Sequence, residues 1–207
     1  MKIFIITLLL MITAASSIAA PIPVPTVFVP SLDLSPTKTV GIFLEAPPTY
    51  INNEKIRSII PEKTIPMFPR AKFTVLPFDQ TAMSVRTYKE DNRMIVNQYY
   101  STPLNRSDIQ KIGKELKCDY VLWLKVDNSA PRVGAGLFSI SFKTTVTADV
   151  RLLNIETMQY LISKEIVKDG SSTAMIMGIP SFENAYAEAL QKALDEFIIT
   201  PATLATM

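Results

Sequence analysis

Two short patterns in this sequence have the residue types needed for chemistry. Gly134-Ala135-Gly136 has the opening spacing of a dinucleotide-binding loop. However, Ser139 stands where the third glycine belongs, and the alternation that follows predicts a strand instead of the helix that would hold a phosphate. Ser35 and Lys38 have the S-x-x-K spacing of penicillin-recognising enzymes, which need both residues on one helix. Pro36 and the strand that follows forbid that helix, so we expect neither chemistry.

The remaining candidates are adjacent carboxylates and a single thiol. Glu90-Asp91 and Asp195-Glu196 fall in expected helices, where neighbouring side chains point apart and cannot face one substrate. The chain has no histidine and one cysteine, Cys118, which excludes Ser-His-Asp and Cys-His catalysis, His-ligated metals and cysteine-cluster metals. We therefore predict a non-enzyme with no catalytic residue, no cofactor and no metal. A hydrolase that uses carboxylates or a Ser-Lys pair stays open as an unfavoured alternative.

The charge balance restricts the partners. Lys and Arg number 21, Asp and Glu 19, and the net charge of the 207-residue chain is +2. A balance this even gives no electrostatic basis for binding nucleic acid.

The amino-terminal residues resemble an export signal. Lys2 precedes the apolar run Ile3–Ile12, and small residues follow up to Ala20. This is the pattern of a secretory signal peptide, and cleavage after Ala19 fits the small-x-small rule. An uncleaved anchor stays open, because residues 3–20 carry no charge. No later segment reaches spanning length, so we expect no stable transmembrane span after cleavage and a periplasmic or extracellular location.

The mature chain divides into an arm, one domain and a short tail. Residues 20–37 form the expected arm, in which five prolines between positions 21 and 36 favour an extended backbone. Val27, Phe28 and Val29 are too apolar for a purely solvated spacer, so we consider them a possible interaction surface. The expected domain covers residues 38–199 and the tail covers 200–207.

The periodicity within the domain predicts a mixed α/β fold. Apolar runs or alternation predict strands, and apolar stripes at helical spacing predict helices. The expected strands are 40–44, 73–78, 120–126, 139–152 and 160–168, and the expected helices are 51–60, 80–97, 105–117 and 181–199. The order β-α-β-α-α-β-β-β-α predicts one mixed sheet of about five strands with helices packed on it. Ser107 and Gln110 have capping-box spacing at the start of the third helix.

The segment 127–138 is predicted to be a long hairpin loop with an apolar tip. Val133, Ala135, Leu137 and Phe138 form that tip. Apolar residues gathered at a loop tip are more useful as a contact surface than as a ligand site. We therefore include them in the possible interaction surface.

Two stretches resemble a group of bacterial envelope proteins. Residues 109–122 read as a helix ending in G-x-x-L-x-x-D-Y-V-L, with Gly113 and Asp119 at the fixed positions, and residues 147–157 read as the later hairpin. The pattern resembles the amino-terminal domain of TolB, the penicillin-binding-protein activator lipoproteins and the curli-secretion lipoproteins. The chain departs from them by lacking a lipidation cysteine and by having Met158 where the hairpin glycine usually stands.

The resemblance implies a non-catalytic interaction module and transfers no catalytic residue. Together with the export signal, it predicts an envelope module that binds another envelope protein or itself. A periplasmic binder of a small ligand or of peptidoglycan is the first alternative, and the hydrolase is the second.

Overall fold

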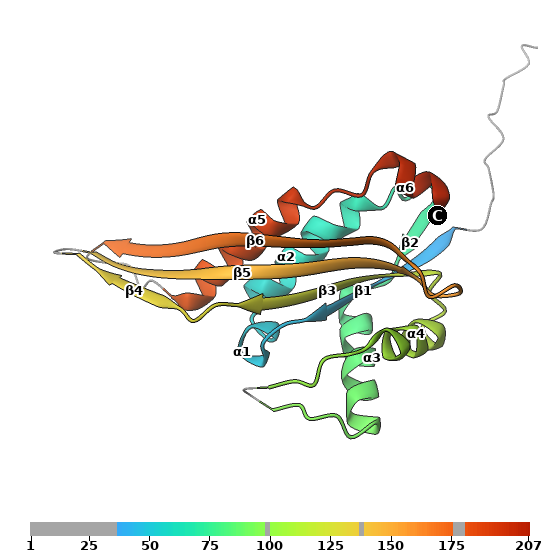
Figure 1. The fold of residues 1–207 in the computed structure, drawn as a ribbon, viewed down its shortest axis with the longest axis horizontal. Helices are drawn as coiled ribbons and strands as arrows, with labels where there is room; N and C mark the ends of the chain where they lie inside the picture. Colours follow the sequence, from blue (N-terminus) through green and yellow to red (C-terminus); the bar gives the residue numbers. More distant parts are fainter. Residues whose placement is uncertain (1–36, 98–99, 137–138, 176–180) are drawn as a thin grey trace, which may run out of the picture. The chain divides into compact units, whose positions relative to one another are not determined.

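The structure, a computed structural model, describes residues 37–97, 100–136, 139–175 and 181–207. Along these residues, strands and helices alternate at first and a run of strands follows (Figure 1). The strands are β1 (Lys38–Glu45), β2 (Phe73–Val75), β3 (Tyr120–Asn128), β4 (Arg132–Ala135), β5 (Ser139–Asn154) and β6 (Tyr160–Met175). The helices are α1 (Pro48–Ile51), α2 (Glu54–Thr64), the 3-10 turn η1 (Ile65–Met67), α3 (Phe78–Asp91), α4 (Arg106–Glu115), α5 (Phe182–Glu196) and α6 (Pro201–Thr206).

The described strands form one mixed sheet, which confirms the predicted fold class. β1 lies between β2 and β3 and is parallel to both. β3 pairs antiparallel with β5, which in turn pairs antiparallel with β4 and with β6. The sheet has six described strands where the sequence predicted about five, and β4 is the additional one.

Helices cover both faces of this sheet, and each face has its own core. Alternate side chains of a strand point to opposite faces. Val40, Ile42 and Leu44 of β1 contribute to the larger core, which includes α2 and α5. Phe43 contributes to the smaller core, which includes α3 and α4.

The long alternating strand of the sequence is β5, which forms a hairpin with β6. Each of these strands has 16 residues. From Thr144 to Leu152 every second residue of β5 is buried, as the alternation predicts. The ends of β5 and β6 that lie farthest from their connecting turn, together with β4, extend beyond the helices (Figure 1).

Helix α5 packs against β6 at a glycine. A Cβ atom on Gly170 would lie 1.9 Å from the backbone oxygen of Ala185 and 2.7 Å from the nitrogen of Ala189. The backbones of the helix and the strand are therefore in direct contact at this position. Gly170 fixes the distance between α5 and the sheet.

Several local expectations need correction or lie outside the described residues. The cap of α4 is Asn105, whose side chain forms a capping box with Asp108, so the predicted box of Ser107 and Gln110 is wrong. Asn105 accepts the backbone N–H of Asp108, and the Asp108 carboxylate accepts the N–H of Asn105. The expected signal peptide 1–19 and residues 20–36 of the expected arm lie outside the described residues. The expected tail, 200–207, contains α6.

Candidate protein-binding surface

Three of the four carboxylates singled out in the sequence belong to separate ion pairs, and Asp91 has none among the described residues. The neighbours Asp195 and Glu196 contact cations on different elements, so they do not converge on one point. The pairs are Glu90 with Arg86, Asp195 with Lys63, and Glu196 with Lys164 and Lys168. Lys38 lies in β1 and pairs with Asp119 at 3.3 Å.

The single thiol is part of the core. Cys118 is buried at the turn between α4 and β3, beside Gly41 of β1. Burial raises the pKa of its thiol to about 12, and the nearby charge of Asp119 adds to the shift. A thiol with this pKa is almost entirely protonated at neutral pH, and the thiolate is the nucleophile. Cys118 therefore packs the core and does not provide a reactive sulfur.

The glycines of the apparent dinucleotide loop belong to an extended chain. Gly134 and Ala135 lie in β4, which pairs with β5, and β3 continues to Asn128. The prediction of a loop throughout 127–138 is therefore wrong at 127–128 and at 132–135. Because a strand follows this turn, no helix N-terminus lies here to hold a phosphate. Within the described part of the chain, no three His, Cys, Asp or Glu side chains come together as a metal site would require.

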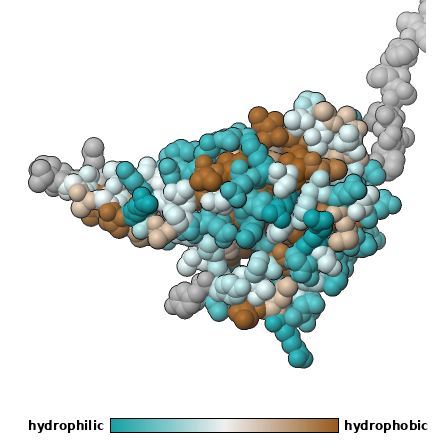
Figure 2. All heavy atoms as spheres, in the orientation of Figure 1, coloured by the Kyte–Doolittle hydropathy of each residue, from teal (hydrophilic) through white to brown (hydrophobic). Residues whose placement is uncertain are grey.

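Beyond the helices the sheet continues as a three-stranded β-ribbon. We use this name for β4 with residues 139–146 of β5 and 168–175 of β6. Val133 lies opposite Phe142 and Ala135 opposite Ile140, so these four side chains share one face. Val133 is 61% exposed and Ile140 48% exposed. Figure 2 shows hydrophobic atoms at this end of the sheet.

This apolar face continues the core of the domain. Val146 lies on the same face of β5 and is completely buried in the larger core. Phe142 marks the boundary, where its ring meets that of Phe182 at the start of α5 with centroids 4.2 Å apart. The sequence of the ribbon is therefore patterned for burial, while its face from Phe142 outward lies beyond the helix.

The two edges of the ribbon differ. At β6, Glu188 of α5 accepts the outward N–H of Ser171 at 2.9 Å, and Lys192 donates to the outward carbonyl of Asp169 at 3.2 Å. Burial opposes ionisation of Glu188, but the hydrogen bonds from Lys192 and Ser171 outweigh it and lower its pKa. Charged side chains of this kind protect a strand edge from pairing with another chain.

At β4 no such protection is present among the described residues. All four residues of β4 are exposed, and the order of the paired strands ends there. Gly136 donates its N–H to the carbonyl of Ser139, which makes these two residues a hydrogen-bonded pair. Because bonded and non-bonded pairs alternate in an antiparallel ladder, Val133 and Ala135 direct their N–H and C=O groups away from β5.

The structure thus places two of the sequence-predicted interaction residues, Val133 and Ala135, together on an open edge. Their partners in that prediction, Leu137 and Phe138, lie outside the described residues, as do Val27, Phe28 and Val29. Ile140 was not singled out from the sequence. Its alternation with polar neighbours predicted a buried position on a strand. It is exposed because α5 does not extend over this part of β5, which the sequence pattern does not reveal.

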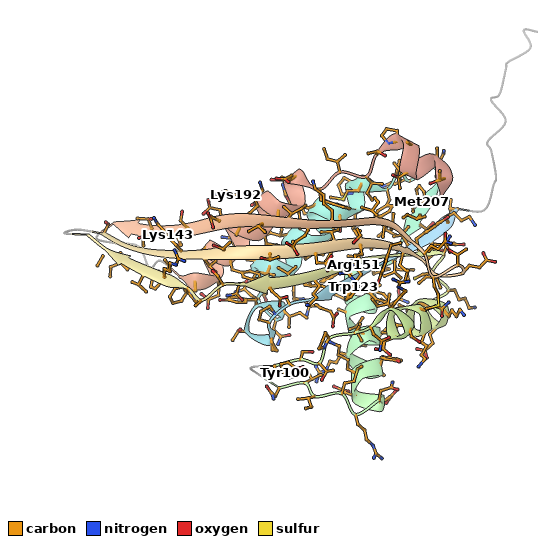
Figure 3. All side chains as sticks on the ribbon, viewed as in Figure 1. Tyr100, Trp123, Lys143, Arg151, Lys192 and Met207 are labelled. Carbon is orange, nitrogen blue, oxygen red and sulfur yellow. The ribbon has the colours of Figure 1, made fainter. Side chains whose placement is uncertain are left out.

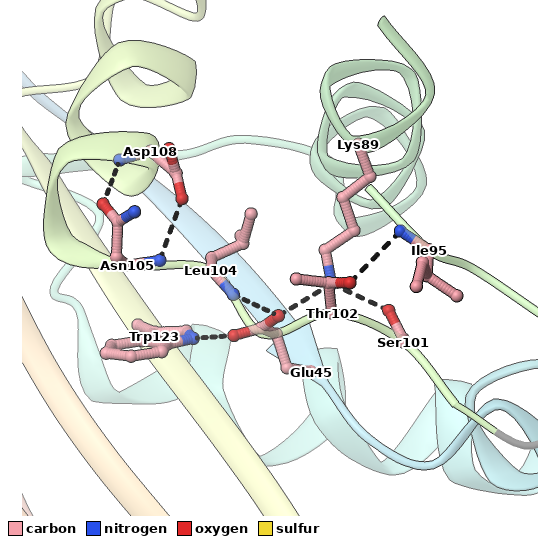
Figure 4. A network of polar contacts seen from close by, with 9 residues as sticks. All are labelled: Glu45, Lys89, Ile95, Ser101, Thr102, Leu104, Asn105, Asp108 and Trp123. Atoms are coloured by element: carbon pink, nitrogen blue, oxygen red, sulfur yellow. Dashed lines mark hydrogen bonds and ion pairs between the residues drawn. The ribbon is translucent and has the colours of Figure 1, made fainter. Parts of the chain in front are cut away.

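A second feature missed by the sequence is a buried polar cluster at the end of β1 (Figure 4). The Glu45 carboxylate, 8% exposed, accepts Lys89 Nζ at 2.8 Å and the Trp123 indole N–H at 2.9 Å. It also accepts the backbone N–H of Leu104 at 3.0 Å, and Lys89 donates to Ser101 as well. A buried charge needs such partners, because an unpaired one would be strongly destabilising.

This cluster anchors the segment between α3 and α4. The described part of that segment carries three exposed apolar side chains, namely Ile95, Val96 and Tyr100. Leu104 of this segment bonds to Glu45 in β1, and Ser101 bonds to Lys89 in α3. We interpret the cluster as structural, since its polar atoms satisfy one another.

Beyond the smaller core, β5 carries polar side chains on the face opposite the apolar side of the ribbon, at the odd-numbered residues 139–151. Arg151 of β5 lies between two rings, with its guanidinium carbon 5.1 Å from the Trp123 centroid and 5.4 Å from that of Tyr160. Its Nε donates to Asp149 at 2.9 Å. Figure 3 shows Arg151 and Trp123 beside each other, away from the ribbon, and Lys143 within the ribbon. The Arg151 stack joins side chains of β3, β5 and β6 at the border of the smaller core.

Two open depressions lie between helices on the surface of the protein. One has a volume of about 380 Å³ and lies between α2 and the start of α3. The other, about 390 Å³, is lined mainly by polar side chains at the starts of α2 and α5. The lining residues of the second are Thr49, Asn52, Asn53, Lys55, Ser181, Glu183 and Asn184.

Comparison with known proteins gives a similarity of fold. No protein-family model matches the chain, and no curated protein matches it. Among solved structures, the chain is similar to lipoprotein GNA1162 from Neisseria meningitidis, with 19% identity, a TM-score of 0.34, and coverage of 70% of this chain and 88% of that one.

Two further structures belong to the groups named by the sequence resemblance. The LpoB C-terminal domain from Salmonella enterica has 13% identity and a TM-score of 0.30, covering 63% of this chain and 81% of that one. TolB from Acinetobacter baumannii has 13% identity and a TM-score of 0.31, covering 78% of this chain and 28% of that one. Similarity at these identities and TM-scores concerns the fold and carries no argument about function.

Among the described residues, no helix has the length and apolar character needed to cross a bilayer.

Proposed function

We propose that this chain is a non-catalytic module exported to the cell envelope, where the β-ribbon binds a protein partner. The observation that carries the proposal is the apolar face of the ribbon, where Val133 and Ile140 are 61% and 48% exposed. A face that is patterned as core but that no described residue covers is typical of an interaction site. The export signal and the sequence resemblance to envelope proteins support the location.

The shape of this surface favours a protein over a small molecule. Small-ligand sites are concave and enclose most of the ligand. The ribbon instead presents a strand edge and a flat apolar face, which are the features that bind extended or flat protein surfaces. We therefore expect a partner that contributes backbone hydrogen bonds and apolar side chains.

Site-specific cross-linking in the native envelope tests this proposal. A photoreactive residue at Val133 should form a covalent adduct with a protein. The same residue at Val167 is the matched control, because Val167 is 53% exposed but lies on the opposite face of the sheet. Adducts at neither position, or equally at both, would contradict the assignment of the ribbon as the binding surface.

The polar depression between the starts of α2 and α5 favours a second candidate function, the binding of a polar envelope ligand such as peptidoglycan. Its three asparagines, two hydroxyls and two opposite charges offer both donors and acceptors. Sedimentation with purified peptidoglycan tests it. Replacing Asn52 and Asn184 together with alanine should abolish co-sedimentation, and unchanged co-sedimentation would exclude this depression.

The division of the chain is also a proposal. We infer that export removes residues 1–19 and leaves an arm at 20–37 before the domain at 38–199. Sequencing the amino terminus of the protein recovered from the envelope tests the cleavage point. A mature chain that still begins at Met1 would show that the segment stays as an anchor.

A further inference from the structure

The free edge of β4 is a template for one additional strand. Val133 and Ala135 present their N–H and C=O groups outward, as the bond from Gly136 to Ser139 requires. The edge at β6 is capped by Glu188 and Lys192, whereas the described residues provide no cap at β4. An edge left open beside a protected one points to a strand that binds there.

The chain itself contains a segment suited to this edge. Residues 26–29, Thr-Val-Phe-Val, form a run without proline between Pro25 and Pro30. Proline cannot donate to a ladder, so these prolines limit an added strand to four residues. β4 also has four residues. Val27 and Val29 alternate with Phe28, so both valines would lie on one face of the sheet.

The length of the chain decides which molecule provides this segment. The strand registers give the distance from Thr37 to the ribbon. Val40 of β1, Tyr120 of β3 and Asn154 of β5 lie side by side across the sheet, and Thr37 precedes Val40 by three residues. Ile140, which faces Ala135, is fourteen residues further along β5, so about 55 Å of strand separates the level of Thr37 from that of Ala135. The ten residues from Val27 to Thr37 span at most about 36 Å.

We propose that residues 26–29 of one molecule add as a strand to the free edge of β4 in a second copy of this chain. The proposal deepens the proposed function and rests on it, because it names the partner of the β-ribbon. Parallel pairing with β4 over all four residues would place Val27 beside Val133 and Val29 beside Ala135 on the apolar face. Each copy donates one segment and receives another, so the contact closes as a dimer with exchanged segments or builds a larger ring or an open chain.

A pair of substitutions at Val133 tests the backbone part of this contact. Val133→Pro removes an outward N–H that β5 does not use, so it leaves the β4–β5 hydrogen bonds in place. Val133→Ala also removes the side chain but keeps the N–H. Light scattering over a concentration series should show assemblies for the natural chain and for Val133→Ala. Val133→Pro should lose every species heavier than one chain, while its urea unfolding midpoint stays unchanged.

Cysteine cross-linking between two differently tagged chains tests the pairing directly. Val27→Cys in one chain and Val133→Cys in the other should form a disulfide-linked heterodimer on mild oxidation. Val167→Cys, on the opposite face, should not form one with Val27→Cys. Cys118 is buried and stays unreacted in both chains.

The possible outcomes separate this proposal from the proposed function. A natural chain that has the mass of one molecule at every concentration overturns the proposal, as does a Val133→Pro chain that assembles like Val133→Ala. If Val133 then cross-links to a different envelope protein, the proposed function stands and the self-assembly is wrong. If Val133 cross-links to nothing, both fail.

Discussion

The contact between α5 and β6 provides the sharpest test of the fold. In Gly170→Ala the new Cβ would lie 1.9 Å from the backbone oxygen of Ala185, whereas a close C···O contact is about 3.3 Å. The atoms in the way are backbone atoms, so α5 must move by more than about 1 Å. This displacement loosens the packing of Ala189 and Leu190, which are completely buried. Overpacking of a core costs about 1–3 kcal/mol, and we expect the upper end, about 3 kcal/mol.

Urea unfolding followed by the fluorescence of Trp123, the single tryptophan, measures this loss. In thermal unfolding, about 3 kcal/mol corresponds to a decrease of roughly 6–12 °C for a domain of this size. Gly134→Ala is the matched control, because its Cβ meets the Ser141 hydroxyl, a flexible group, and the expected change is within about 0.5 kcal/mol. A loss below about 1 kcal/mol for Gly170→Ala would refute the close packing of α5 on β6.

Three other substitutions or treatments test the core and the turns. Glu45→Ala leaves the Lys89 ammonium buried without its carboxylate, so urea unfolding should show a loss of about 3–5 kcal/mol, and a neutral result would contradict the buried ion pair. Met158 has a backbone φ of 58°, a left-handed conformation that glycine adopts freely. Met158→Gly should therefore raise the free energy of unfolding by about 0.5–1 kcal/mol. A decrease would show that the contacts of the Met158 side chain stabilise the fold by more than the backbone strain destabilises it. Because the folded-state pKa of Cys118 is about 12 and the unfolded value about 9, its thiolate fraction at pH 8 should be about a thousandfold lower in the folded protein than in urea, and thiol labelling should be slower by at least that factor. The same shift makes folding stability fall as the pH rises above 9, because only the unfolded thiol then ionises; equal labelling rates in the two states would contradict the burial.

The elements with strong local patterns were predictable from the sequence. The alternation over 139–152 predicted a long strand, and β5 runs from Ser139 to Asn154. The apolar stripe over 181–199 predicted the last helix, and α5 runs from Phe182 to Glu196 with Ser181 as its cap. In both elements, one face is buried along most of the length, so the periodicity of the sequence follows the burial.

The features that were missed depend on pairing and contacts that leave no periodic pattern in the sequence. β4 has four exposed residues, so no alternation marks it, and only its pairing with β5 makes it a strand. Lys89 looks like a solvated charge on a helix, and its partner Glu45 is 44 residues away in the sequence. No local pattern reports such a pair. The edge of β6 was missed for the same reason, because its caps come from α5.

The residues that carry the sequence resemblance hold the fold together. A Cβ on Gly113 would lie 2.6 Å from the Ile155 side chain, so this glycine lets α4 approach the sheet. Asp119 accepts the backbone N–H of Thr39 at 2.7 Å and joins the starts of β1 and β3. These positions therefore stabilise the packing of α4 and the pairing of β1 with β3. They lie far from Val133 and Ala135, whose environment is set by where the helices stop covering the sheet. The motif at α4 therefore does not determine which partner binds at β4. The chemistry of that partner has to be inferred from the residues of the ribbon.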